Sequence, residues 1–382
     1  MRIALVGCGA VTQAVYVPLL SRRRDLFEVV AVCDLSRTLA DAVGDRLGAA
    51  GRFTSVAELL SAGGFEAVLV LASGSHGETV GRALAGGYAV LCEKPLALTR
   101  AEVAGLPEGR LMVGYMKQYD PAVRRAEELL AELGGPEAIR SVEVTVLHPS
   151  GESQLAFANL TQARDVDPGL LDSLRAAERD LVSRALGESA PEQVRALYGV
   201  ALGSICHDLS LLRRFTGSPA EISYVEAWGP APGSIEITGP LPVRGRFSIR
   251  WHYLEDYPAY RETVAIHHDR GSLELVFPSP YLMNAPTTLT VVSGAESRTE
   301  YRDVTEAFEV QLAAFHAFVN DGKPPLTDAG GGLEDIVTAQ RIAARYAVQH
   351  DLPIGGEAMS ERSERPIKHS SVALMRPTEE GA

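Results

Sequence analysis

A lysine follows one apolar run in a chain that almost always uses arginine for positive charge. The sequence holds 32 arginines and only four lysines: Lys94, Lys117, Lys323 and Lys368. Lys94 comes directly after Ala89-Val90-Leu91-Cys92-Glu93, a run typical of a buried strand. Residues at the carboxyl ends of parallel strands face the ligand crevice, where a compact ammonium can stabilise negative charge developing on oxygen. The alternative is a structural ion pair between Lys94 and Glu93.

A glycine-rich turn near the start of the chain has the pattern of a dinucleotide site. Gly7-Cys8-Gly9-Ala10-Val11-Thr12 lies between a predicted strand and a predicted helix, where glycines let the backbone approach a pyrophosphate. The third glycine of the usual fingerprint is Thr12, so the helix must shift or the threonine side chain must find a pocket. A plain glycine-rich turn is the alternative.

Asp34 supports the nucleotide interpretation and bears on the choice of coenzyme. It follows the apolar run 29–33 and lies 22 residues after Thr12, where a carboxylate accepts hydrogen bonds from both ribose hydroxyls. Because its charge repels a 2′-phosphate, NAD is favoured. NADP stays open because the Arg37 guanidinium can stack on adenine or meet a phosphate. The alternative for Arg37 is a solvated residue at a helix start.

Apolar runs alternate with helical patterns over residues 1–121. The runs at 3–6, 29–32, 67–71, 89–91 and 111–113 are typical of strands buried on both faces, and segments such as 38–47, 56–62 and 77–85 have helical spacing. This βαβ series predicts an α/β domain with a doubly wound parallel sheet of the Rossmann type.

After Pro121 the pattern indicates a second domain, which we expect over residues 122–355. A predicted helix ends at Gly134-Gly135-Pro136, and apolar residues then recur at every second position from Val142, as in strands with one buried face. Further strands are expected at 221–228, 247–253, 262–268, 272–277 and 287–293. We predict an α+β domain with a largely antiparallel, open-faced sheet, whose free face can form a homodimer or homotetramer.

Two segments depart from this second pattern. Residues 154–195, approximately, are polar and helix-prone, and are expected to be an insertion before a helix that begins near Gly203. Residues 356–382 are expected to be a polar, disordered tail.

Composition narrows the classes of partner. The chain has 382 residues, 46% of them hydrophobic, and a net charge of −13, which disfavours nucleic acid and anionic lipid surfaces. The uncharged stretch 275–295 contains three prolines and is a poor membrane helix, and the apolar run at the start is too short for a signal peptide. Four widely spaced cysteines suggest neither disulfides nor a metal site, so the cytoplasm is expected.

Gly7-Cys8-Gly9, Asp34, Glu93-Lys94-Pro95 and His207 together resemble the glucose-fructose oxidoreductase, inositol dehydrogenase and rhizopine catabolism (Gfo/Idh/MocA) family. The resemblance spans roughly residues 1–350. It implies a tightly held NAD or NADP and a reaction at one secondary hydroxyl of a sugar or cyclitol. Segment 73–76, with Ser73 and His76, looks like the family's loop beside the nicotinamide.

The resemblance implies that Lys94 and His207 are catalytic, with His207 accepting a proton and Glu93 holding the turn and the cofactor. The family usually has an aspartate four residues before this histidine, where this chain has Gly203. Ser204, Asp208 or a tyrosine such as Tyr115 or Tyr257 could take the place of that aspartate. Tyr115 and Lys117 lie in segment 114–121, which is similar to the family's entry into the second domain, with Gln118 where an arginine is common. Substrate contacts are expected from Tyr115, Lys117, Asp208 and Tyr257.

The leading hypothesis is therefore an NAD(P)-dependent oxidoreductase acting on a secondary hydroxyl, or its ketone, of a sugar, aminosugar or cyclitol. One alternative uses the coenzyme transiently, as a glycosidase, lyase or epimerase without net redox change. The other is a sensor that binds dinucleotide and sugar without turnover, which the missing aspartate at position 203 favours.

Overall fold

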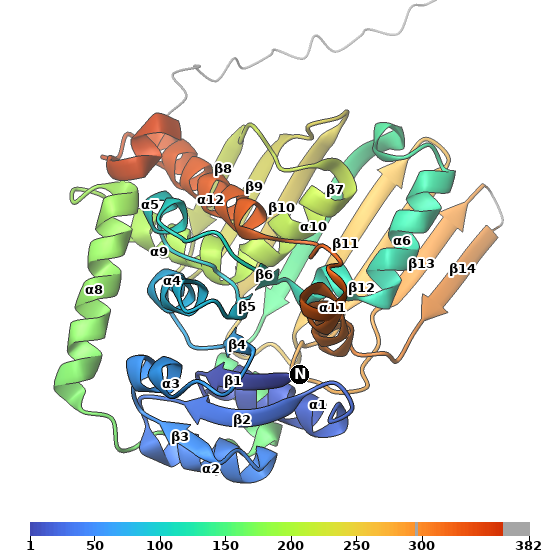
Figure 1. The fold of residues 1–382 in the computed structure, drawn as a ribbon. Helices are drawn as coiled ribbons and strands as arrows, with labels where there is room; N and C mark the ends of the chain where they lie inside the picture. The colour runs from blue at the N-terminus through green and yellow to red at the C-terminus, as the bar shows by residue number, and fades with distance from the viewer. Residues whose placement is uncertain (295–296, 362–382) are drawn as a thin grey trace, which may run out of the picture.

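The computed structural model describes residues 1–294 and 297–361, which fold around two sheets (Figure 1). The first is parallel, in the order β3-β2-β1-β4-β5-β6. Its strands are β1 (Arg2–Val6), β2 (Glu28–Cys33), β3 (Gly51–Phe53), β4 (Ala67–Val70), β5 (Ala89–Glu93) and β6 (Leu111–Gly114). The strand order reverses between β1 and β4, so the predicted doubly wound sheet is confirmed, with its ligand crevice expected at the carboxyl ends of these strands.

Helices cover both faces of this sheet, because successive residues of each strand point to opposite sides. In β1, Ile3 and Leu5 pack in one core cluster, and Ala4 and Val6 pack in the other. The connecting helices are a π-helical turn η1 (Thr12–Tyr16), α1 (Val17–Arg22), α2 (Arg37–Leu47), α3 (Val56–Ala62), α4 (Gly77–Ala85) and α5 (Arg100–Ala104), followed by a 3₁₀ turn η2 (Met116–Tyr119).

The second sheet has the order β14-β13-β12-β11-β7-β10-β9-β8. Its neighbouring strands are antiparallel except for β7 and β10, so the predicted largely antiparallel sheet is confirmed. The strands are β7 (Ile139–His148), β8 (Tyr224–Trp228), β9 (Ser234–Pro240), β10 (Arg246–Tyr253), β11 (Arg261–His268), β12 (Gly271–Phe277), β13 (Thr288–Ser293) and β14 (Ser297–Arg302). The sequence did not predict β3, β9 or β14; β14 is exposed on both faces and so lacks an apolar alternation.

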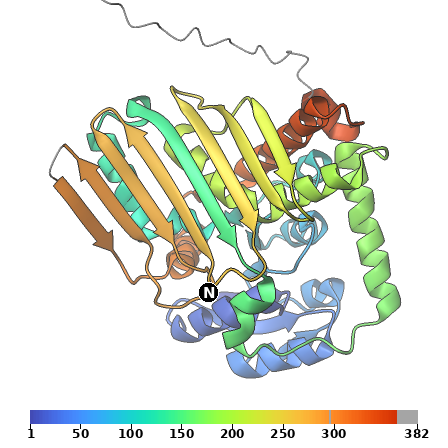
Figure 2. The same cartoon turned by 180° about the vertical axis from the view of Figure 1, so that it is seen from behind.

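One face of the second sheet carries helices, and the other is bare in the described part of the chain (Figures 1 and 2). The helices of this half are α6 (Pro121–Glu132), η3 (Pro136–Ala138), α9 (Glu192–Val200), η5 (Ala201–Ile205), α10 (Cys206–Thr216), α11 (Ala307–Asp321) and α12 (Ala329–Gln349). Phe308, Leu312 and Phe315 of α11 belong to the core of the first sheet instead, which ties the two halves together.

The polar insertion contains α7 (Gly151–Leu155), η4 (Ala156–Ala158) and the long helix α8 (Pro168–Leu186), which stands at one edge of the molecule (Figure 1). The expectation of a helix beginning near Gly203 is wrong. That helix begins at Glu192 and runs through the π-helical turn η5 into α10, because Val194, Leu197 and Tyr198 bury a helical stripe.

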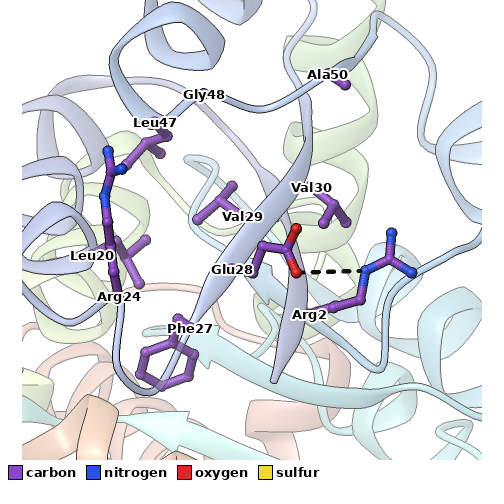
Figure 3. A pocket seen from close by; sticks show the side chains of 10 residues that line it. All are labelled: Arg2, Leu20, Arg24, Phe27, Glu28, Val29, Val30, Leu47, Gly48 and Ala50. Carbon is purple, nitrogen blue, oxygen red and sulfur yellow. Dashed lines mark ion pairs between the residues drawn. The ribbon is translucent and has the colours of Figure 1, made fainter.

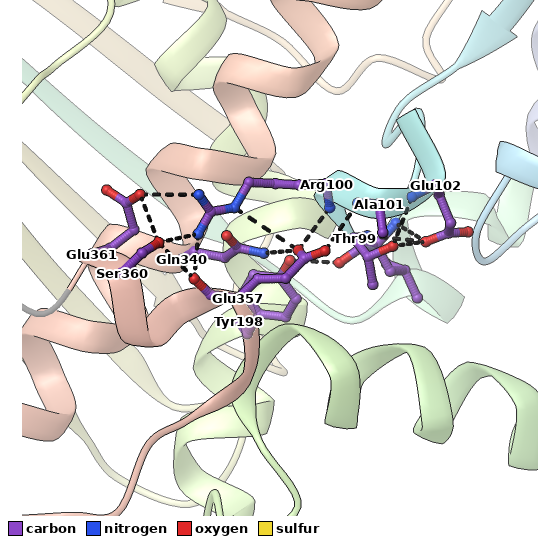
Figure 4. A network of polar contacts seen from close by, with 10 residues as sticks. Thr99, Arg100, Ala101, Glu102, Tyr198, Gln340, Glu357, Ser360 and Glu361 are labelled. Carbon is purple, nitrogen blue, oxygen red and sulfur yellow. Dashed lines mark hydrogen bonds and ion pairs between the residues drawn. The ribbon is translucent and has the colours of Figure 1, made fainter. Parts of the chain in front are cut away.

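The expected tail boundary at residue 356 also needs correction, because Gly356–Glu361 forms the 3₁₀ helix η6 (Figure 4). The Glu357 carboxylate accepts hydrogen bonds from the N–H groups of Arg100 and Ala101, at the start of α5, and Ala358 is fully buried. The sequence of residues 356–361 is polar and gives no sign of these partners, which lie far away along the chain. Residues 362–382, the rest of the expected tail, lie outside the described residues.

Candidate functional site

The glycine-rich turn connects β1 to η1 at the carboxyl edge of the first sheet. Gly7 has φ +97°, and a Cβ there would lie 2.4 Å from the backbone nitrogen of Ala72, so only glycine fits. A Cβ at Gly9 would meet nothing within 4 Å, which leaves open space above the turn for a phosphate. Thr12 is buried, and its hydroxyl donates to the Gly7 carbonyl at 2.7 Å. The hydroxyl of Thr12, which replaces the third glycine of the fingerprint, therefore has a hydrogen-bond partner within the turn.

Asp34, at the end of β2, is held by two backbone donors. Its Oδ2 accepts from Cys8 N–H at 2.7 Å and its Oδ1 from Ser36 N–H at 2.9 Å. The carboxylate is only partly buried, so its remaining lone pairs can accept from ribose hydroxyls. Ala10 and Val11 are likewise partly exposed beside it, whereas Arg37 is exposed and paired with Asp41, with Nε 3.0 Å from Oδ1. These residues fit a dinucleotide with a free 2′-hydroxyl.

Glu93, the last residue of β5, points into the protein, and its Oε2 accepts from the backbone N–H of Lys94 at 3.3 Å. It is buried, and its Oε1 accepts from the Tyr16 hydroxyl at 2.6 Å, which in turn accepts from Gln311 Nε2 at 3.2 Å. Burial raises the pKa of Glu93 above its ordinary value. Glu93 thus joins β5, η1 and α11 and supports the turn that carries Lys94.

Lys94 belongs to the first half of the chain and contacts a residue of the second half. Its Nζ donates to the backbone carbonyl of Gly203 at 2.6 Å, and no ion pair of Lys94 occurs among the described residues. A π-helical turn leaves carbonyls without the regular helical partner, and Gly203 lies in such a turn. The carbonyl of Gly203 therefore anchors the Lys94 ammonium although position 203 has no acidic side chain.

His207 follows this π-helical turn and is partly buried. Its ring makes an edge contact with Tyr115, at 6.0 Å between centroids, while Tyr115 itself is buried against the Arg213 guanidinium. Burial, followed by the charges of Lys94 and Lys117, lowers the pKa of His207 well below its ordinary value. The imidazole is therefore neutral at physiological pH, as a proton acceptor must be.

Four polar side chains form a buried cluster behind His207. The Lys117 ammonium donates to Glu262 Oε2, which also accepts from the Tyr260 hydroxyl at 2.5 Å. Burial and the Glu262 charge raise the pKa of Asp208 well above its ordinary value. Asp208 Oδ1 and Glu262 Oε1 have no hydrogen-bond partner among the described residues. The raised pKa favours the protonated form of Asp208.

His148 is a site residue that the sequence did not predict. It ends β7 and packs against Trp251, Tyr253 and Tyr260, and burial, with smaller effects of Lys94 and Lys117, lowers its pKa. Nearby, Trp251 Nε1 donates to the Ser204 hydroxyl at 2.9 Å. The sequence signal that could have identified His148 is its position at the end of a strand with alternating apolar residues.

Three other predicted site residues lie as follows. Ser73 is exposed in the loop after β4. His76 is buried, with its ring nitrogens 2.6 Å from the Pro95 carbonyl and 2.5 Å from the Ala72 carbonyl, so it joins the loops after β4 and β5. Tyr257 lies between β10 and β11 and lines a hollow together with Tyr260 and Phe277. Of these two tyrosines, Tyr260 is the one whose hydroxyl donates to Glu262 in the buried cluster.

A large hollow elsewhere on the first domain does not belong to this site. It has a volume of about 460 Å³ and is lined by Arg2, Leu20, Phe27 and Glu28 among others, at the amino ends of β1 and β2 (Figure 3). Among the described residues, no three His, Cys, Asp or Glu side chains are grouped to hold a metal ion, and no helix is long and apolar enough to cross a membrane.

Comparisons with known proteins agree with this fold. Residues 1–108 match the family model described as an oxidoreductase family with an NAD-binding Rossmann fold. An inositol 2-dehydrogenase from Ralstonia nicotianae is 34% identical over 147 residues, which span 36% of this chain but only 43% of that protein. A crystallised UDP-N-acetylglucosamine 3-dehydrogenase from Acidithiobacillus ferrooxidans is 20% identical, with a TM-score of 0.63 over 92% of this chain and 99% of its own, and shows the fold alone.

One relative matches both domains. A D-xylose 1-dehydrogenase (NADP(+)) from Haloferax volcanii is 30% identical over 314 residues, covering 79% of this chain and 84% of its own. Because this match continues through the second domain, the agreement is not confined to a nucleotide-binding fold that many enzymes share. The chain belongs to the Gfo/Idh/MocA family of oxidoreductases.

Proposed function

We propose that this protein is an NAD(P)-dependent oxidoreductase that transfers a hydride between a nicotinamide coenzyme and a secondary hydroxyl, or its ketone, of a sugar, aminosugar or cyclitol. The observation that carries the proposal is the contact between Lys94 Nζ and the Gly203 carbonyl. It brings a cation at the carboxyl edge of the nucleotide-binding sheet against the helix that bears His207.

The coenzyme, when bound along Gly7–Gly9 and Asp34, supplies the hydride acceptor or donor. Lys94 stabilises the negative charge that develops on the substrate oxygen, since a fixed cation in a partly buried site costs no reorganisation. His207 accepts the hydroxyl proton. Its Nδ1 is buried, and no hydrogen bond to Nε2 occurs among the described residues, which leaves Nε2 as the nitrogen for the substrate.

The rest of the site orients these two groups and binds the substrate. The Gly203 carbonyl holds Lys94 in place, and Tyr115 supports the His207 ring. We assign Lys117, with Asp208, Glu262 and Tyr260, to the polar wall of the substrate site, and Trp251 and His148 to its aromatic wall. Aromatic faces beside hydrogen-bonding groups suit a sugar or cyclitol ring.

The test is an absorbance assay of coenzyme reduction and oxidation with a panel of polyols, sugars and aminosugars, using NAD and NADP separately. We expect stoichiometric coenzyme turnover with at least one class of substrate. Conversion of a substrate without net coenzyme turnover would instead indicate transient oxidation, and tight binding of coenzyme and sugar without any hydride exchange would indicate a sensor.

A further inference from the structure

The insertion between β7 and α8 reaches the nucleotide-binding domain at two places. Gln13 Nε2 donates to the Thr161 carbonyl at 3.1 Å, and Thr161 N–H donates back to Gln13 Oε1 at 2.9 Å. Four residues later, Asp165 accepts hydrogen bonds from the Ser36 hydroxyl and from Thr38 N–H, the latter at 2.9 Å. The segment 161–165 therefore runs from the glycine-rich turn to the residues that follow Asp34.

Asp165 completes the amino end of α2. Helix amino ends attract anions because their first N–H groups lack helical partners. In α2 the N–H of Leu39 donates to the buried Ser36 hydroxyl, and the N–H of Thr38 donates to Asp165. We call the Ser36 hydroxyl and the Thr38 N–H the α2 anion position, and the protein fills it with its own carboxylate.

Two carboxylates lie at this position, and their charges are unfavourable for a phosphate. Asp34 and Asp165 both contact Ser36, one through its N–H and the other through its hydroxyl. Arg37 could have paired with a phosphate, but it is paired with Asp41 instead. Hydrogen bonds from Ser36 and Thr38 lower the pKa of Asp165 to about 2, so its charge persists at neutral pH.

The occupied α2 anion position bears on the choice between NAD and NADP. An acidic residue after β2 accepts the ribose 2′-hydroxyl of NAD, whereas NADP carries a phosphate on the same oxygen and needs positive or N–H partners beside it. The α2 anion position lies two to four residues after Asp34, so its hydroxyl and N–H are the hydrogen-bond donors next to the expected ribose site. A 2′-phosphate would have to displace Asp165 or face two carboxylates.

We propose that Asp165 is a coenzyme-specificity residue, which excludes the 2′-phosphate of NADP by occupying the α2 anion position and so favours NAD. The inference rests on the proposed function, because it requires that a nicotinamide dinucleotide binds at Asp34. It assigns a binding role to the inserted segment, which comes from the second half of the chain.

The test is calorimetric titration of the full chain with NAD⁺ and with NADP⁺ at low salt. Asp165→Ala and Asp165→Asn are compared with the wild type and with Asp172→Asn. This control removes an equal charge from α8, where Asp172 is exposed and paired with Arg175. We expect both Asp165 variants to bind NADP⁺ about tenfold more tightly or better, with NAD⁺ affinity changed less than about threefold. Asp172→Asn should change neither affinity.

An unchanged NADP⁺ affinity in both folded Asp165 variants would overturn the inference and leave the proposed function intact. An equal loss of affinity for both coenzymes would also overturn it, because Asp165 would then only anchor the insertion. A wild type that prefers NADP⁺ has the same consequence. A wild type that binds neither dinucleotide would overturn the proposed function itself. Thermal unfolding of each variant shows that it is folded before titration.

Discussion

Lys94 is held by a backbone carbonyl, which has consequences for its charge and its freedom. A carboxylate partner would neutralise the ammonium, whereas the Gly203 carbonyl orients it without cancelling its charge, as the proposed role of Lys94 requires. The same charge acts on His207, whose pKa it helps to lower. The Lys94 ammonium and the His207 imidazole are therefore electrostatically coupled, and changing the charge of one changes the titration of the other.

Replacing Lys94 by Ala should abolish most turnover with little loss of stability. Loss of one preorganised charge-stabilising group reduces kcat by about 10²–10³-fold in comparable sites. Steady-state kinetics measure the loss, and thermal unfolding measures stability. Lys323→Ala is the matched control, because Lys323 is an exposed lysine in the turn after α11. Activity of Lys94→Ala within about twofold of the wild type would refute the role of Lys94.

The pH dependence of alcohol oxidation should reflect the lowered pKa of His207. A histidine accepts a proton only in its neutral form, which predominates above its pKa. Because burial and two lysines lower that pKa, kcat/KM should stay level through pH 6.5 and fall only at more acidic pH. Lys94→Ala removes one of the lowering charges, so the fall should move to higher pH in the residual activity. An identical profile in the variant would contradict the coupling.

At the scale of elements, α10 carries His207, and another residue of the same helix forms an ion pair with α12. The Arg213 guanidinium of α10 forms two hydrogen bonds with the Asp335 carboxylate of α12, and the side chains of Arg213 and Asp335 are exposed by 14% and 3%. Arg213 also lies over the ring of Tyr115, which contacts His207. This buried ion pair therefore fixes the helix and the aromatic support together.

Asp335→Asn should destabilise the protein by about 3 kcal/mol or more, because it leaves the Arg213 charge buried without its counter-charge. Urea unfolding followed by circular dichroism measures the difference. Asp172→Asn breaks the exposed pair with Arg175 and should cost no more than about 0.5 kcal/mol. Equal stability of Asp335→Asn and Asp172→Asn would show that the buried pair does not hold α10 to α12.

At the scale of the whole molecule, the bare face of the second sheet is the clearest surface for self-association (Figure 2). In β8, Val225 points into the core, and Tyr224 and Trp228 on the other face are exposed by 39% and 46%. Exposed aromatic residues on a sheet face are common in protein interfaces. In a monomer, this face of the sheet would have no packing partner among the described residues.

We therefore predict a homodimer or homotetramer, with a sedimentation mass two or four times 40.9 kDa. Trp228→Glu places a charge on the face and should shift the distribution toward smaller species without changing the secondary structure. Arg175→Glu, on the exposed side of α8, is a control for surface charge and should leave the assembly unchanged. A stable wild-type monomer at micromolar concentration would contradict the prediction.

The sequence determined the elements and the type of each residue at their ends. Apolar runs, glycine spacing and helix formers act over a few residues, so β1, β5 and α3 could be predicted within one or two positions, and Asp34 and Lys94 could be placed at strand ends. The strand β14 escaped prediction because it is exposed on both faces and lacks an apolar alternation, and the 3₁₀ helix η6 escaped it because its partners, such as Arg100, are distant in the sequence.

Only the tertiary structure decided which distant residues meet. Lys94 and Gly203 are 109 positions apart in the sequence, and Ser36 and Asp165 are 129 positions apart. Neither contact leaves a local pattern, because a carbonyl or a carboxylate at the right distance needs no particular neighbours in sequence. The helix register, the π-helical turn and the path of the insertion bring these atoms together. Composition and periodicity carry no information about such contacts.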